Sequence, residues 1–135
     1  MSISTSWYDD EHRVIVQKFE GTWSWEELAR EQAKLRTLAS TVAHKIVFYN
    51  EMTRTNILPK GNILGYGRTS VANVPENVTF IIIVLDSRLI EVFAKLVFDM
   101  SSKWRNRVQF VKTIDEGQKL VAEAVATNIA HSGAS

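Results

Sequence analysis

Apolar residues occur along this chain in short runs that are separated by helical patterns. The longest run extends from Val78 to Leu85, and Thr79 is its only polar residue. A run this short, rich in β-branched residues and preceded by Val74-Pro75-Glu76-Asn77, predicts a strand that is buried on both faces. Such strands belong to parallel sheets that helices cover, so the pattern predicts an α/β fold.

The other strands are predicted from shorter patterns. Two short segments that look like strands stand on either side of a polar turn at 8–12, which predicts an antiparallel hairpin. Within this hairpin, Gln17 and Lys18 are expected to tolerate water. The chain between 50 and 60 is expected to be irregular. The four strands are expected at 3–7, 13–19, 46–49 and 107–111.

The first helix has two start signals that agree. Ser24 is followed three residues later by Glu27, which is the pattern of a capping box. Trp23 and Leu28 stand at the two positions of a hydrophobic staple. The sequence therefore predicts a helix that begins after Ser24 and ends near residue 38 or 39.

Three further helices are predicted downstream. The helix over 61–73 is weak, because each glycine inside it costs about 1 kcal/mol relative to alanine. Asp86 or Ser87 caps a long helix over 87–104, and Thr113 opens the last helix through a second capping box. Together the patterns predict one α/β domain over 1–135, with a mixed five-stranded sheet, an N-terminal antiparallel hairpin and four helices.

Composition narrows the range of functions. The chain of 135 residues has no cysteine, which excludes disulfides, thiolate metal sites and a cysteine nucleophile. Sixteen Lys and Arg residues oppose fifteen Asp and Glu residues, so no field of one sign directs the chain to nucleic acid. No apolar run approaches the ~20 residues of a membrane span. The sequence also lacks the pattern of a secretory signal, so we expect a cytoplasmic location.

No catalytic or metal-binding pattern is present in the sequence. His12, His44 and His131 lack a metal-ligand spacing such as His-Glu-x-x-His, so no metal is expected. No nucleophile stands beside an obvious base, which leaves a Ser-His-Asp mechanism without support. The sequence therefore predicts neither an enzyme nor a bound cofactor.

The long helix over 87–104 carries the strongest functional signal. At 100° per residue its apolar positions cover an arc of roughly 160°, whereas a surface helix needs about 100°. The sheet alone is not expected to cover this arc, so a second subunit, a neighbouring helix or a lipid should do so. The candidate residues for contact with a partner or ligand are Ile90, Ala94, Phe98 and Trp104.

A second candidate site lies at the carboxyl ends of the strands, where open α/β sheets bind ligands. Asn50, Met52 and Asp86 are expected at this edge of the sheet. A role for Asp86 as the cap of the following helix explains that residue without any ligand, so both interpretations stay open.

Four stretches of sequence, together with the order of the elements, carry a family resemblance. They are Gly21-Thr22-Trp23-Ser24-Trp25-Glu26-Glu27-Leu28, Leu58-Pro59-Lys60-Gly61-Asn62-Ile63-Leu64, Val74-Pro75-Glu76-Asn77 and Arg107-Val108-Gln109-Phe110-Val111-Lys112-Thr113-Ile114-Asp115-Glu116. In these the chain resembles the SpoIIAA-like family, which is related to the STAS domains of anti-sigma-factor antagonists. The resemblance implies a SpoIIAA/STAS-like fold, which is similar to that of CRAL-TRIO lipid-binding domains and so keeps a lipid ligand open.

The resemblance also implies a place for a regulatory switch. The related antagonists are switched by phosphorylation of a serine that follows the second buried strand. The matching stretch here, 49–56, contains no serine, and its aliphatic hydroxyl side chains are those of Thr53 and Thr55. Phosphorylation at this junction is therefore not expected to regulate the protein.

The expected function is that of a non-enzymatic regulatory or protein-interaction module, which forms a homodimer. The alternative is a carrier of a small apolar ligand or lipid, bound beneath the helix over 87–104.

Overall fold

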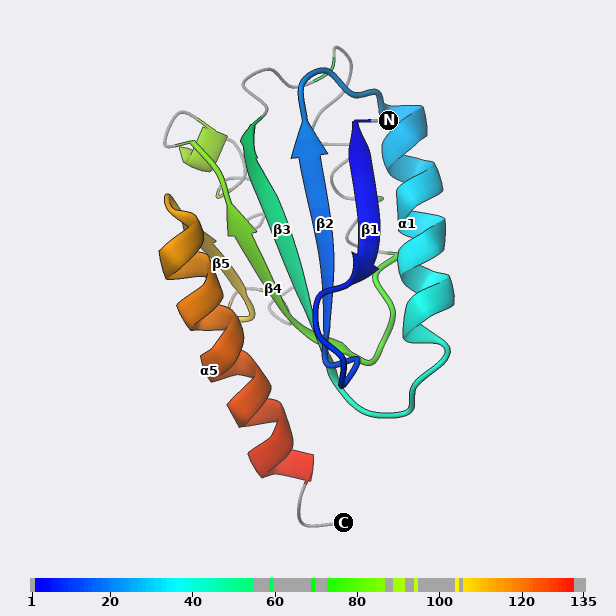
Figure 1. The fold of residues 1–135 in the computed structure, drawn as a ribbon, viewed down its shortest axis with the longest axis vertical. Helices are drawn as coiled ribbons and strands as arrows, with labels where there is room; N and C mark the ends of the chain where they lie inside the picture. The colour runs from blue at the N-terminus through cyan, green and yellow to red at the C-terminus, as the bar shows by residue number, and fades with distance from the viewer. Residues whose placement is uncertain are drawn as a thin grey trace.

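The fold is an α/β arrangement built on a five-stranded mixed sheet (Figure 1). The structure is a computed structural model, and it describes residues 2–54, 59, 69, 73–86, 89–91, 94, 104 and 106–132. The strands lie side by side in the order of the sequence. They are β1 (Ile3–Trp7), β2 (Val14–Glu20), β3 (Ile46–Arg54), β4 (Val78–Val84) and β5 (Val108–Val111).

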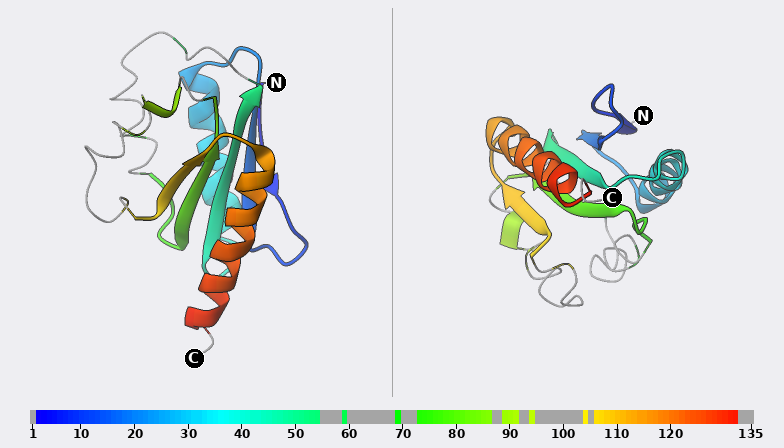
Figure 2. Two further views of the ribbon diagram at one scale, coloured as in Figure 1. Left: turned by 90° about the vertical axis from the view of Figure 1, so that its left-hand side faces the viewer. Right: turned by 90° about the horizontal axis from the view of Figure 1, so that it is seen from below.

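Strand direction confirms the predicted hairpin and the predicted mixed sheet. β1 and β2 pair antiparallel, and β2, β3, β4 and β5 pair parallel to one another. Two helices have defined bounds, α1 (Trp25–Ala39) and α5 (Ile114–Ser132). They lie on opposite sides of the sheet (Figure 2). Among the described strands, β1 and β5 are the two edges of the sheet, as the strand order shows.

The apolar run that predicted a doubly covered strand forms β4 between β3 and β5. Ile81 packs in the core on the side of α1. Ile82 and Val84 pack in the core on the side of α5. The prediction of a strand buried on both faces is confirmed, because successive side chains point to opposite faces of the sheet.

β3 (Ile46–Arg54) is longer than the strand predicted at 46–49. The prediction of irregular structure over 50–60 is therefore wrong for residues 50–54. Asn50 and Glu51 have low strand propensity, but each pairs with β2 on one side and with β4 on the other. Two neighbouring strands stabilise a segment that would not form a strand by itself, since strand preference depends strongly on context.

The start of α1 is where the sequence placed it. The helix begins at Trp25, and the hydroxyl of Ser24 accepts a hydrogen bond from the backbone N–H of Glu27 at 3.1 Å. Trp23 packs in one core cluster with Leu28, as the staple requires. The carboxylate of Glu27 does not complete the predicted capping box. It accepts the backbone N–H groups of Ser2 and Ile3, both at 2.8 Å, and so connects α1 to the start of β1.

We expect the change Ser24→Ala to lower the free energy of unfolding by about 1 kcal/mol, because it removes the hydroxyl that caps α1. The change Ser24→Asp supplies another good capping oxygen and should stay close to wild type. Urea melts of the three proteins test this expectation. Equal stability of Ser24→Ala and wild type would show that the cap contributes nothing.

The last helix also begins as predicted. The hydroxyl of Thr113 accepts the backbone N–H of Glu116 at 3.1 Å and donates to the Glu116 carboxylate at 3.0 Å. The predicted inward residues Val121 and Ala124 are buried, and Leu120 and Val125 are partly buried against them. Gly117 lies on the same buried side, one turn before Val121.

The two other predicted helices, over 61–73 and 87–104, lie for the most part outside the described residues. The described residues within them at 69, 89–91, 94 and 104 all have helical backbone.

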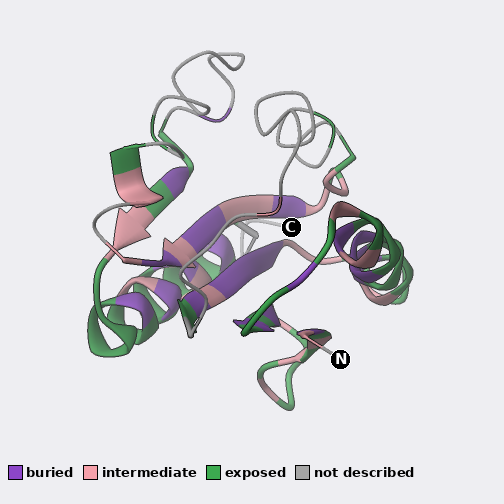
Figure 3. Cartoon of the chain, turned by 90° about the horizontal axis from the view of Figure 1, so that it is seen from above, coloured by how far each residue is buried: buried purple, intermediate pink, exposed green. Residues whose placement is uncertain are grey.

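Apolar side chains form the described core on both faces of the sheet. Figure 3 colours the buried residues of the strands and helices purple. On the side of α5, Val16 and Tyr49 pack with Val121. On the side of α1, Ile15 and Phe48 pack with helix residues, which are Leu35 and Ala39. Polar side chains interrupt this second layer near β1, and they belong to the candidate site.

Candidate functional site

The described surface has at least three hollows. The strand-end cleft lies at the carboxyl ends of β2 and β3, the α5 groove lies between α5 and strands β4 and β5, and the edge groove lies between β1 and α1.

The strand-end cleft occupies about 210 Å³ at the edge where a ligand site was predicted. Its lining residues are Lys18, Phe19, Glu20, Glu51, Thr53 and Ile114. The predicted residues Asn50 and Met52 do not line it, because both are buried, and Met52 packs in the core with Leu85. Side chains alternate along a strand, so the residues that face the cleft are Glu51 and Thr53.

Asp86 lies where a helix cap is expected. Its backbone carbonyl accepts hydrogen bonds from the N–H groups of Leu89 and Ile90, at 2.9 and 3.3 Å. These bonds are typical of the residue that precedes the first turn of a helix. The interpretation of Asp86 as a helix cap therefore has direct support.

The charge of the strand-end cleft bears on the predicted absence of a phosphorylation switch. Thr53 is exposed and shares the cleft with Lys18 and with two carboxylates, Glu20 and Glu51. A phosphate on Thr53 would add about two negative charges beside those carboxylates, which is unfavourable. The local charge supports the expectation, and Thr55 lies outside the described residues.

The residues predicted to contact a partner from the long helix are in different environments. Trp104 is buried in the core against Ile81. Ile90 packs against the cluster that contains Met52. Ala94 is exposed, and Phe98 lies outside the described residues. Contacts within this chain therefore account for the apolar side chain of Trp104.

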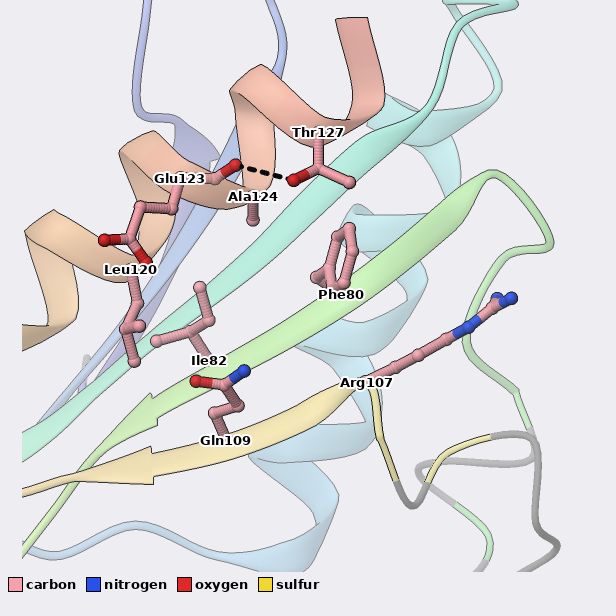
Figure 4. Close-up of a pocket in the computed structure, with 8 residues that line it drawn as sticks. All are labelled: Phe80, Ile82, Arg107, Gln109, Leu120, Glu123, Ala124 and Thr127. Atoms are coloured by element: carbon pink, nitrogen blue, oxygen red, sulfur yellow. Dashed lines mark hydrogen bonds between the residues drawn. The ribbon is translucent and has the colours of Figure 1, made fainter. Parts of the chain in front are cut away.

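The α5 groove is a small apolar hollow of about 150 Å³ with a polar rim (Figure 4). Ile82 and Ala124 form part of its floor, and Figure 4 shows the side chain of Arg107 extending away from that floor. Sites for small molecules commonly have about 300–1,000 Å³, so this groove fits a single side chain better than a ligand.

The edge groove adjoins unpaired backbone groups of β1. The carbonyl of Ser2 accepts from the N–H of Glu20 at 2.7 Å, and the N–H of Tyr8 donates to the carbonyl of Val14 at 2.8 Å. Antiparallel pairs alternate in this way, so the backbone groups of Thr5 and Trp7 point away from β2. Within the described part of the chain, the N–H groups of Thr5 and Trp7 have no hydrogen-bond partner.

The wall opposite that edge is α1, which runs beside β1 (Figure 1). The edge groove has about 310 Å³ and is lined by Thr5, Ala33, Lys34, Thr37 and Leu38. It therefore combines a free strand edge with a helix wall that contributes small, apolar and cationic side chains.

A chain of polar side chains links the edge groove to the interior of the sheet. The Gln17 amide donates to the Thr5 hydroxyl at 3.0 Å, and that hydroxyl donates to the Glu31 carboxylate at 2.9 Å. The ammonium of Lys34 lies 2.8 Å from the other Glu31 oxygen. Gln17 is 1% exposed and Glu31 is 3% exposed. The expectation that Gln17 tolerates water is wrong, because its side chain is buried and its amide donates to the Thr5 hydroxyl. Lys18 is exposed, as expected.

Burial has a titration consequence at Tyr49, which lies on the other face of the sheet. The Tyr49 ring is fully buried and meets the Tyr8 ring edge-on, with 5.6 Å between centroids. Desolvation raises the pKa of the Tyr49 hydroxyl far above its ordinary value of 10.0, and the Glu51 carboxylate raises it further.

We expect Tyr49 to make the protein less stable in alkali. Above about pH 10 the unfolded tyrosine ionises and the folded one does not, so unfolding becomes more favourable as pH rises. Urea melts between about pH 8 and 11 measure the effect. The change Tyr49→Phe should make the decline with pH shallower. A parallel decline in both proteins would show that Tyr49 is not responsible.

A scan against models of protein families, a search of curated proteins and a search of solved structures each found no match to this chain. The interpretation of the chain as SpoIIAA-like therefore rests on its sequence motifs and element order. In the part of the chain that the structure describes, no helix is long and apolar enough to cross a membrane. Nor do the described His, Asp and Glu side chains gather in any group of three that could hold a metal ion.

Proposed function

We propose that this protein is a non-enzymatic regulatory module of the SpoIIAA-like type that works by binding another protein. The observation that carries the proposal is the open edge of β1. Natural sheets protect their edges with charged residues, prolines, bulges, short strands or a covering helix, because an open edge pairs with other chains. In β1 the Glu27 carboxylate of α1 covers the N–H of Ile3, and among the described residues the N–H groups of Thr5 and Trp7 stay open. The sequence of β1, Ile3–Trp7, contains none of these charges or prolines, and it pairs with β2 without a register shift.

The described hollows offer contact surfaces for the side chains of a protein partner. The three hollows have about 150, 210 and 310 Å³, and the largest is the edge groove itself. The two smaller hollows are below the roughly 300–1,000 Å³ that is common for small-molecule sites, and the edge groove is at the lower end of that range. A carrier would need an apolar cavity beneath the helix predicted over 87–104, and most of that segment lies outside the described residues.

Self-association belongs to the same proposal. The wide apolar arc predicted for 87–104 favours a second subunit there, with Phe98 at its outer margin.

Native mass spectrometry of the protein purified from its host, combined with lipid extraction, tests the proposed function. A mass of two chains, or of one chain with a second protein, supports an interaction module. A mass with a retained small apolar molecule supports the carrier instead. A single chain with nothing attached would count against both functions.

A further inference from the structure

We infer that the edge groove binds an extended peptide segment of a partner, which joins the sheet as an added strand beside β1. The inference rests on the proposed function and names the chemistry of its partner. The segment carries an apolar residue and an acidic residue two positions apart, and both side chains lie in the edge groove.

The backbone of β1 supplies the main attraction. In an antiparallel pair, the residue opposite Thr5 exchanges two hydrogen bonds with it, through the outward N–H and C=O groups of Thr5. The N–H of Trp7 offers one more donor in the same direction. The N–H of Ile3 is already bound by the Glu27 carboxylate, at 2.8 Å. The free part of the edge is therefore short and centred on Thr5.

The lining of the edge groove sets the preference for side chains. Every second side chain of an added strand faces the same side, so two of them reach the groove. Leu38 offers an apolar contact, and the half-exposed Lys34 offers its ammonium. The ammonium of Lys34 has three hydrogen-bond donors, and Glu31 accepts from one of them. A carboxylate of the partner can therefore accept from another.

The order of the two residues follows from the direction of α1. Helix and strand run the same way (Figure 1), and Leu38 packs with the cluster that Trp7 also contacts. Leu38 therefore lies near the end of β1, and Lys34 lies nearer Thr5, which shares the Glu31 carboxylate with it. In an antiparallel segment, the apolar residue comes first and the acidic residue lies opposite Thr5.

A single extended segment fits this edge better than a second copy of the chain. Pairing β1 with β1 of another copy would place both α1 helices on one face of the joined sheet. The two strands would be about 4.8 Å apart, whereas packed helices need about 8–10 Å between their axes. Each α1 runs directly beside its own β1, so the two helices would compete for the same space.

The test uses the blocked pentapeptide acetyl-Thr-Val-Thr-Glu-Thr-amide and isothermal titration. Methylation of the glutamate nitrogen removes the N–H that pairs with Thr5 and should weaken binding at least about tenfold. Methylation of the central threonine nitrogen, which faces away from β1, should change binding by less than about threefold. Replacement of the glutamate by lysine should weaken binding at least about threefold, because it meets Lys34.

Two protein variants locate the site. Ala33→Arg fills the edge groove from an exposed helix position and should weaken peptide binding at least about tenfold. Ala122→Arg makes the same change on the exposed side of α5 and should bind like wild type. Thermal melts of both variants confirm that each is folded.

Three results would overturn the inference. The first is no binding of the pentapeptide at about 1 mM, a concentration that detects even an affinity of about −4 kcal/mol. The second is equal loss from the two methylated peptides, or binding that survives Ala33→Arg. The third is a dimer of the wild type and a monomer of Ala33→Arg, both measured by light scattering. That result would mean that a second copy of the chain occupies the edge groove. The proposed function has a separate test: native mass spectrometry that shows neither a dimer nor a protein partner would contradict it.

Discussion

Replacing Thr5 with valine is expected to lower the free energy of unfolding by about 3 kcal/mol, although the two side chains have nearly the same shape. The Thr5 hydroxyl accepts from the Gln17 amide and donates to the Glu31 carboxylate. Both of those groups are almost completely buried. Without the hydroxyl, each is left in the interior with one partner fewer, at about 1–3 kcal/mol for each group.

The matched control is Thr5→Ser, which keeps the hydroxyl and removes one methyl group. It should cost about 1 kcal/mol or less. Urea melts measure both variants. Equal losses would show that packing of the methyl group matters at this position and that the polar chain does not. Valine keeps the backbone N–H and C=O of residue 5, so the folded Thr5→Val protein should still bind the pentapeptide.

Replacing Gly117 with alanine is expected to cost about 2 kcal/mol, even though alanine is the better helix former. A Cβ atom at this position would lie 2.5 Å from a methyl group of Val84 and 3.0 Å from the Tyr49 ring. α5 therefore approaches the sheet closely at Gly117. The new methyl group would force α5 away from β3 and β4, and the gain in helix propensity of about 1 kcal/mol would not offset that strain.

A double-mutant cycle with Val84→Ala separates the clash from other effects. Removing the Val84 methyl groups opens space for the new Cβ, so Gly117→Ala should cost at least about 1 kcal/mol less in that background. Chemical denaturation of the four proteins gives the coupling energy. An increase in stability for Gly117→Ala alone would mean that α5 does not approach the sheet closely there.

Local patterns were sufficient where a structure depends on neighbours in sequence. The two short strand patterns at 3–7 and 13–19, with a polar turn between them, predicted the hairpin. The hydroxyls of Ser24 and Thr113 predicted the first residues of α1 and α5. These features involve residues three to five positions apart or one short turn, so the sequence contains the whole interaction.

Local patterns failed where distant segments meet. Asn50 and Met52 were expected at a ligand edge, and the structure buries both. The sequence pattern ended this strand at residue 49, whereas β3 continues to Arg54, so Asn50 and Met52 are strand residues whose side chains are buried. The length of β3, and which of its side chains face each side of the sheet, are set by its pairing with β2 and β4. No short window of sequence contains all three strands.

The sequence by itself determined the α/β class, the hairpin, the buried run of β4 and the starts of α1 and α5. Each of these follows from periodicity or from capping within a few residues. Only the tertiary structure decided that β1 is an edge strand, that Glu27 binds its first N–H groups, and that Thr5 joins Gln17 to Glu31. The physical reason is distance along the chain: Thr5 and Glu31 are 26 residues apart and Ile3 and Glu27 are 24 apart. Hydrogen bonds over such separations form only after the sheet and α1 have packed together, so the edge groove exists only in the folded protein.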